Sequence, residues 1–113
     1  MPYGYHAFVD GIAWAASAMV AARTRLEIAT DNLANVSTDR FARIAARGTL
    51  TASGVSISRS REPVPAPGMP NGVDAIAEMV DVLAAERSFE SAQKAVAAID
   101  QSRQKSADAA RIS

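Results

Sequence analysis

Apolar residues in the first third of the chain recur at alternating intervals of four and three positions. The series is Phe8, Ile12, Ala15, Met19, Ala22, Leu26, Ala29, Leu33 and Val36. A helix that repeats its apolar residues in this way carries them as one continuous seam, and such a seam packs along another helix. The spacing therefore predicts a long first helix whose partner is a second helix.

A second helix is predicted from about residue 73 to residue 111. Its seam is Val82, Ala85, Phe89, Ala92, Val96 and Ile99, again in steps of three and four. Four further apolar residues, Ile76, Met79, Val80 and Leu83, are expected to widen the stripe at its beginning. Asn71 and Asp74 are both candidates to cap its start. Beyond Ile99 the sequence becomes polar, which indicates either a polar helix or a frayed end.

The segment between the helices has a different chemistry. Val55 and Ile57 alternate with Ser56 and Ser58, which predicts a short β-hairpin over residues 44–61 with a turn at Ser53-Gly54. Four of the five prolines then lie between residues 63 and 70, so this stretch is predicted to be an extended connector rather than a helix or a central strand.

The predicted fold is mainly α, with two long terminal helices packed as a coiled-coil-like hairpin. Its four segments are the first helix with an Asn-rich motif (1–43), the short β-hairpin (44–62), the Pro-rich linker (63–72) and the second helix (73–113). A helical seam does not distinguish a partner in the same chain from a partner in another chain. Both arrangements stay open at this point.

Composition excludes several classes of function. Twelve basic and twelve acidic residues cancel, so no overall field attracts nucleic acid. The chain has no cysteine and a single histidine, His6, and neither a catalytic triad nor a phosphate-binding loop is recognisable. The apolar run 12–22 is too short to span a membrane, and no basic residue precedes it as in a cleaved signal peptide. The chain is not expected to be an enzyme or to bind a cofactor, a metal or a small-molecule substrate.

The stretch "NLANVSTDRF", residues 32–41, ends the first seam with residues that favour turns. Together with Ala29 it resembles a motif of the bacterial flagellar rod and hook family of axial proteins. The matching positions are Ala29, Asn32, Leu33, Ala34, Asn35, Thr38 and Phe41. The family has glycine where this chain has Arg40. If that position needs a positive φ, either Arg40 is strained, or Asp39 takes over the conformation, or the turn has another shape.

The second helix resembles the C-terminal motif of the same family. The matching residues are Val73, Asp74, Glu78, Met79, Val80, Arg87, Ser88, Phe89 and Glu90. Two motifs in the correct order at opposite ends of the chain are more specific than either alone. The resemblance covers roughly residues 15–100, and the short middle segment is similar to that of the small proximal-rod members.

The resemblance implies a structural subunit of the flagellar basal-body rod. Such a protein is exported through the flagellar type III apparatus without cleavage of a signal peptide, and it assembles in the periplasmic rod with copies of itself and with other rod and hook proteins. The expected assembly interface is formed by Ile12, Met19, Leu26, Leu33, Val36, Met79, Val82, Phe89, Val96 and Ile99. The alternative from another class is a soluble helical-hairpin adaptor or chaperone for flagellar or type III secretion substrates.

Overall fold

Two long helices and one β-hairpin make up the regular structure of this protein. The computed structural model describes residues 2–112, and the side chains of residues 10–111. In chain order the elements are α1 (Pro2–Ala34), β1 (Ile44–Thr51), β2 (Gly54–Arg61) and α2 (Ala75–Ile112). The predicted mainly-α class with a two-stranded antiparallel hairpin is confirmed. His6 and Phe8 lie outside the described side chains.

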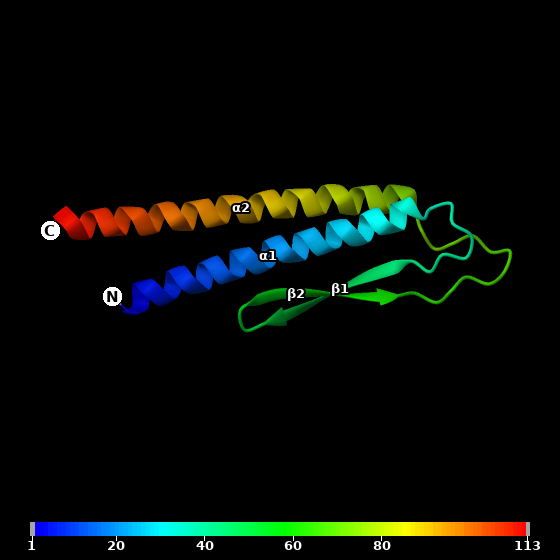
Figure 1. Ribbon diagram of the computed structural model, residues 1–113, viewed down its shortest axis with the longest axis horizontal. Helices are drawn as coiled ribbons and strands as arrows, with labels where there is room; N and C mark the ends of the chain where they lie inside the picture. Colours follow the sequence, from blue (N-terminus) through cyan, green and yellow to red (C-terminus); the bar gives the residue numbers. More distant parts are fainter. Residues whose placement is uncertain (1, 113) are drawn as a thin grey trace.

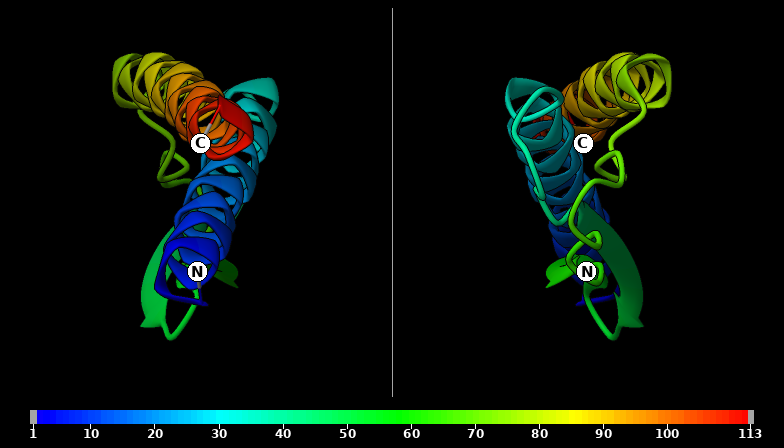
Figure 2. Two further views of the ribbon diagram at one scale, coloured as in Figure 1. Left: turned by 90° about the vertical axis from the view of Figure 1, so that its left-hand side faces the viewer. Right: turned by 90° about the vertical axis from the view of Figure 1, so that its right-hand side faces the viewer.

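The molecule is long and thin because its elements lie side by side in one direction. Helix α1 lies between α2 and the hairpin and packs against both, whereas the described residues of α2 and of the hairpin do not pack on each other (Figures 1 and 2). The principal extents are 74 × 23 × 13 Å. The radius of gyration is 19.6 Å, compared with about 13 Å for a compact domain of this length.

Helix α1 has two contact stripes rather than one. Toward α2 it buries Ala15, Ala22 and Ala29, while the larger seam residues Ile12, Met19, Leu26 and Leu33 are only half-buried. Toward the hairpin it carries Ser17, Ala21, Ile28 and Asn32, of which the last three are buried. This second stripe was missed in the sequence because its spacing of four, seven and four positions includes a serine and an asparagine. The predicted seam also ends earlier than expected, since Val36 lies beyond the helix and is 40% exposed.

Helix α2 turns one stripe toward α1 and leaves another uncovered. Glu78, Ala85 and Ala92 are buried at intervals of seven, and Val82, Phe89, Val96 and Ile99 are half-buried beside them. Ile76, Met79, Val80 and Leu83 are 74%, 55%, 58% and 56% exposed. The prediction that these four widen the seam is wrong. Val80, for example, lies two residues beyond Glu78 and so about 200° around the helix.

The ends of α2 settle two alternatives. Asp74 is the cap, because its Oδ1 accepts hydrogen bonds from the backbone N–H groups of Ile76 and Ala77 at 3.0 and 3.3 Å. The polar segment after Ile99 continues as helix to Ile112, and its described side chains are all exposed. Neither described helix has an apolar window long enough to cross a membrane.

The hairpin lays one face on α1 and turns the other to solvent. Ile44 pairs with Arg61 at its open end and Thr51 with Gly54 at its tip. Val55 and Ile57 are half-buried while Ser56 and Ser58 are exposed, so the predicted alternation is confirmed. The predicted turn is shifted by one residue. Ala52 and Ser53 form the turn, and Gly54 is the first residue of β2.

Gly54 is required where the hairpin tip approaches α1. A Cβ atom at this position would lie 2.7 Å from Ser17 Cβ and closer still to Ser17 Oγ, and the φ angle of Gly54 is +145°. Ser17 Oγ accepts a hydrogen bond from Val55 N–H at 3.1 Å and donates one to the Trp14 carbonyl oxygen at 2.8 Å. Moving the Ser17 side chain away from an added Cβ atom would break these hydrogen bonds.

Replacing Gly54 with alanine is expected to lower the free energy of unfolding by about 2 kcal/mol. The new Cβ atom would clash with Ser17, and alanine is strained at the positive φ angle of this position. Gly68→Ala is the matched control. Gly68 also has a positive φ, of +82°, but a Cβ atom added there would have no neighbour within 4 Å. Urea denaturation compares the two variants, and equal losses would show that the close approach to Ser17 contributes nothing.

Candidate functional site

A polar cluster joins the end of α1, the start of β1 and the segment before α2, and we call it the junction. Asn32 lies at its centre and is completely buried, with 0% of its surface exposed. The Asn32 amide donates to the Ile44 carbonyl oxygen at 2.9 Å and accepts from the Ile44 N–H at 2.8 Å. One side chain thus satisfies both backbone groups of the first residue of β1. The helix and the hairpin are fixed to each other at this point.

Asn71 closes the same end of α1 from the connector. Its Nδ2 group lies 3.1, 3.0 and 2.9 Å from the carbonyl oxygens of Asn35, Val36 and Thr38. These carbonyl groups follow the end of a helix, where the main chain lacks intrahelical partners. Asn71 Oδ1 in turn accepts a hydrogen bond from Val73 N–H at 3.1 Å. Asn71 therefore links the end of the first helix to the entry of the second.

The turn after α1 is held by its own polar residues. Asn35 Nδ2 donates to the Asp31 carbonyl oxygen at 2.8 Å, and Thr38 Oγ1 donates to Asn35 Oδ1 at 3.0 Å. Arg40 has a φ of +56°, so it adopts the left-handed conformation itself and Asp39 does not take it over. Arg40 Nε donates to the Pro65 carbonyl oxygen at 3.2 Å. This bond ties the strained position to the connector and offsets part of its conformational cost.

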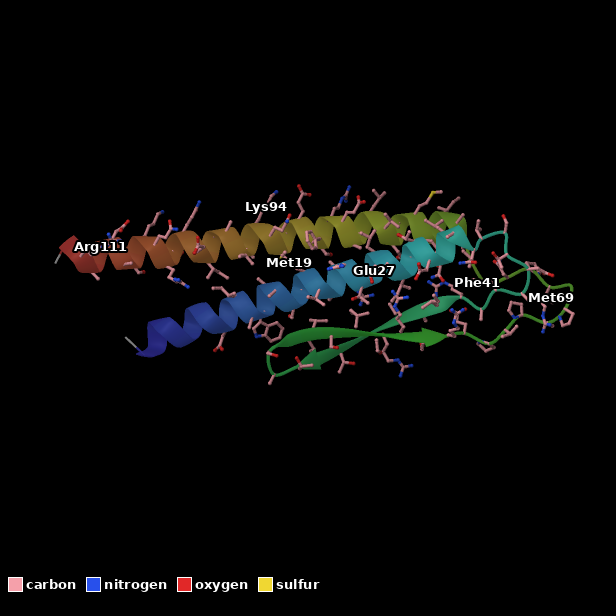
Figure 3. All side chains as sticks on the ribbon, viewed as in Figure 1. Met19, Glu27, Phe41, Met69, Lys94 and Arg111 are labelled. Atoms are coloured by element: carbon pink, nitrogen blue, oxygen red, sulfur yellow. The ribbon has the colours of Figure 1, made fainter. Side chains whose placement is uncertain are left out.

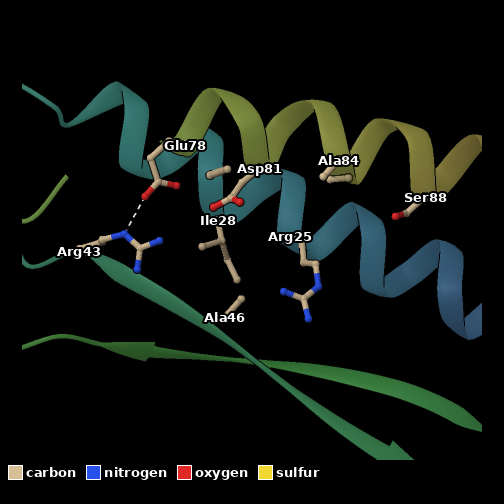
Figure 4. A pocket seen from close by; sticks show the side chains of 10 residues that line it. Arg25, Ile28, Arg43, Ala46, Glu78, Asp81, Ala84 and Ser88 are labelled. Atoms are coloured by element: carbon tan, nitrogen blue, oxygen red, sulfur yellow. Dashed lines mark hydrogen bonds and ion pairs between the residues drawn. The ribbon is translucent and has the colours of Figure 1, made fainter. Parts of the chain in front are cut away.

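Arg43, the residue before β1, forms an ion pair with the buried Glu78 of α2. Arg43 Nε lies 2.7 Å from Glu78 Oε1 (Figure 4), and Arg43 Nη1 lies 3.0 Å from Glu62 Oε1. The side chain of Glu78 is 1% exposed and that of Arg43 is 26% exposed. Partial burial lowers the pKa of Arg43, but the hydrogen bonds and charges of Glu78 and Glu62 outweigh burial, so the pKa is raised overall. The guanidinium stays charged and neutralises the buried carboxylate.

The ion pair borders a cavity of about 320 Å³ between α1, α2 and β1 (Figure 4). Arg25, Ile28, Asp81 and Ser88 line it together with small alanine side chains. Within the described part of the chain, no three His, Cys, Asp or Glu residues are placed to hold a metal ion. Glu62 and Glu78 both pair with Arg43 instead.

Some of the motif residues singled out in the sequence take part in the junction, and others do not. Asn32, Asn35, Thr38 and Glu78 take part in the junction. Phe41 is half-buried, with the Arg61 guanidinium 5.5 Å above its ring. Leu33 and Phe89 do not reach the junction and are half-buried in the contact between the helices, and Ala34, Met79 and Arg87 are exposed. The described residues offer Arg87 no ion-pair partner within 4.0 Å, whereas Glu27 pairs with Arg23 and Arg59.

The ten residues expected at the assembly interface all retain accessible surface in the single chain. Ile12, Met19, Leu26, Leu33, Val82, Phe89, Val96 and Ile99 are half-buried between or beside the helices, and Val36 and Met79 are exposed. Figure 3 shows Met19 on α1 near α2. The fold thus brings eight of these residues to one inter-helix layer without covering them completely.

Three residues of the site were not predicted. Arg43, Glu62 and Ser17 carry ordinary signals in the sequence. Arg43 is a charge just after the Asn-rich motif, Glu62 is a charge beside the proline-rich stretch, and Ser17 is a serine within an alanine-rich helix. Arg43 meets Glu78 across 35 positions, and Ser17 meets Val55 across 38. Local patterns do not report such distant pairs.

Two antiparallel terminal helices, joined by a polar junction and covered by a small hairpin on one side, define an elongated structural subunit. Two family models match the chain in the same places. The model described as "Flagella basal body rod protein" matches residues 12–41, and the model described as "Flagellar basal body rod FlgEFG protein C-terminal" matches residues 71–109. The chain belongs to the flagellar rod and hook family. A comparison with curated proteins found no match.

Family membership fixes the function at a general level. The chain has a structural role in the flagellar basal-body rod, and these rod families are not enzymes. The alternative of a soluble adaptor or chaperone finds no support in either match. The two matched ranges contain Asn32, Asn71 and Glu78 of the junction, whereas Arg43 and the hairpin lie between them.

Proposed function

We propose that this protein is a rod subunit that self-assembles through the apolar faces of its two terminal helices. The observation that supports the proposal most strongly is the identity of the buried residues. Apart from Ile28 and Ile44, the buried hydrophobic residues in the described part of the chain are all alanines. Apart from Ile28, the described larger apolar side chains of both helices remain half-buried or exposed.

This distribution has an energetic consequence. Burial stabilises in proportion to apolar area, so an alanine-lined contact between two helices contributes little per residue. Leu26, Phe89 and their neighbours also line an open apolar groove between α1 and α2, on the side that Ala22 and Ala85 share. A further helix packed along this groove would cover the larger side chains, and coiled-coil-like spacing of four and three on both helices suits such packing.

In this proposal the partners are other copies of the chain and neighbouring rod or hook proteins. The chain reaches its position in the periplasmic rod through the flagellar export apparatus. Family membership supports both statements. The half-buried leucine and phenylalanine side chains support association between subunits in particular. A pair of helices that was stable without a further partner would bury these side chains.

Replacing Phe89 or Leu33 with aspartate is expected to reduce incorporation into rods at least tenfold (order of magnitude), because each contact would then bury a charge. The measurement is the amount of the variant in basal bodies purified from cells that express it as their sole copy. Gln101→Asp, at an exposed position on the same helix outside this groove, is the control. Circular dichroism of each purified variant separates a folding defect from an assembly defect. Normal rods built from a folded Phe89→Asp variant would overturn the proposal.

A further inference from the structure

The β-hairpin is held on α1 more firmly at its base than at its tip. At the base, Ala42 and Ile44 are buried, and the Asn32 side chain makes hydrogen bonds to both backbone groups of Ile44. Exposure then increases along β1, and every residue from Arg47 to Thr51 is exposed. The buried contact that holds β1 on α1 is therefore concentrated near Ile44.

One hydrogen bond fixes the tip of the hairpin to α1 in the described part of the chain. Val55 donates its backbone N–H to Ser17 Oγ at 3.1 Å. Gly54 is buried here but has no side chain, Val55 is only half-buried, and Leu50 is 77% exposed. Because burial stabilises in proportion to apolar area, moving the tip away from α1 would expose little apolar surface and would cost little.

Between the base and the tip, ion pairs of Arg59 hold the hairpin on α1. Arg59 Nη1 lies 3.0 Å from Asp31 Oδ2, and Arg59 Nη2 lies 3.4 Å from Glu27 Oε2. Arg59 pairs with Ala46 in the hairpin, so these contacts lie two residues beyond Ile44. The three charged side chains are 42%, 51% and 48% exposed. Ion pairs as exposed as these are weak and are screened by salt.

From these observations we propose that the hairpin is a strap that opens from its tip while its base stays fixed. The pivot is the pair of hydrogen bonds between Asn32 and Ile44, and the ion pairs of Arg59 form a salt-sensitive latch. Opening breaks the bond between Val55 and Ser17 and uncovers the buried Ala21 of α1. The helix pair does not follow this motion, because the described residues of α2 and of the hairpin do not pack on each other. The inference concerns the single chain and does not depend on the proposed self-assembly.

Two backbone amides report on the two ends of the strap in the same way. Val55 at the tip and Ile44 at the base each donate a hydrogen bond to a side-chain oxygen of α1. Hydrogen exchange of both amides is measured by NMR on the dilute chain at 0.1 M and 1 M NaCl, relative to an unstructured peptide at the same salt concentration. The Debye length falls from about 10 Å to about 3 Å over this range. We expect the Val55 amide to exchange about threefold faster at 1 M NaCl and the Ile44 amide to be unchanged.

Two arginine variants test whether the latch causes this response. Arg59→Met removes the latch, so the Val55 amide is expected to exchange about threefold faster already at 0.1 M NaCl, with no further increase at 1 M. Arg47→Met removes the same charge from an exposed residue of the same hairpin that makes no ion pair in the described structure, and it is expected to keep the salt response of the unchanged chain. Unchanged protection of the Ile44 amide shows that each variant is folded.

Three results would overturn the inference. If the Val55 amide exchanges equally fast at both salt concentrations in the unchanged chain, exposed ion pairs do not hold the strap. If Val55 and Ile44 are accelerated by the same factor, the hairpin leaves α1 as a whole and has no pivot at Asn32. If Arg59→Met responds to salt as the unchanged chain does, Arg59 is not the latch. A chain that stays monomeric at every concentration would contradict the proposed function without affecting any of these measurements.

Discussion

Replacing Arg43 with methionine is expected to lower the free energy of unfolding by about 3 kcal/mol, which corresponds to roughly 12 °C in the melting temperature. The change leaves the Glu78 carboxylate, 1% exposed, without the guanidinium that lies 2.7 Å away. An uncompensated buried charge costs more than the pair itself contributes. Thermal unfolding followed by circular dichroism at micromolar concentration measures the effect on the monomer.

Two companion variants test the cause of this loss. Arg47→Met makes the same change four residues later, at an exposed arginine of β1 without an ion pair in the described structure, and it is expected to change stability by less than about 0.5 kcal/mol. Adding Glu78→Gln to Arg43→Met is expected to recover part of the loss, because the buried group is then neutral. Equal melting temperatures for Arg43→Met and Arg47→Met would show that the ion pair does not hold the junction.

Replacing Asn32 with aspartate is expected to lower the free energy of unfolding at pH 7 by about 3 kcal/mol. The two side chains have nearly the same shape, but a carboxylate oxygen would face the Ile44 carbonyl oxygen at a position where the Asn32 amide now donates at 2.9 Å. Asn35→Asp is the control. Asn35 makes its hydrogen bond at the surface, so water screens the new charge and a loss below about 1 kcal/mol is expected.

The loss in the Asn32→Asp variant is expected to depend on pH. Burial and the facing carbonyl oxygen raise the pKa of the new carboxyl group above its value in the unfolded chain, which is about 3.9. The penalty is therefore complete above the folded pKa, shrinks as the pH falls through that value, and is absent below about pH 3.9. A protonated carboxyl group also donates to the Ile44 oxygen. Urea denaturation at several pH values measures this change, and a loss that is the same at pH 7 and pH 4 would contradict the account.

The sequence predicted the elements of this fold better than their contacts. Heptad spacing located both helices, and alternation of valine and isoleucine with serine located the hairpin, since these patterns are set by the period of each element. The same patterns did not show that Ile76, Met79, Val80 and Leu83 stay exposed in the single chain. Apolar character says that a side chain favours burial, and it does not say whether the partner belongs to the same molecule.

The junction shows a second limit of sequence reasoning. Asn32 and Glu78 were singled out as motif residues, but their burial and partners depend on Ile44 and Arg43, which lie 12 and 35 positions away. A buried glutamate contradicts the usual preference of charged residues for the surface, and only the position of Arg43 in three dimensions explains it. Arg40 was identified as the departure from the family pattern, and its φ of +56° shows that it adopts the left-handed conformation that glycine adopts without steric cost.

The most direct test of the account is hydrogen exchange of the purified chain, measured when dilute and again at concentrations where it assembles. We expect the amides around Asn32, Ile44 and Asn71 to be protected under both conditions, because the junction is complete within one chain. The α2 amides between residues 76 and 99 should exchange at least tenfold (order of magnitude) more slowly in the assembly, where neighbours cover the larger apolar side chains. Equal protection of this segment in the dilute monomer and in the assembly would contradict assembly through these faces.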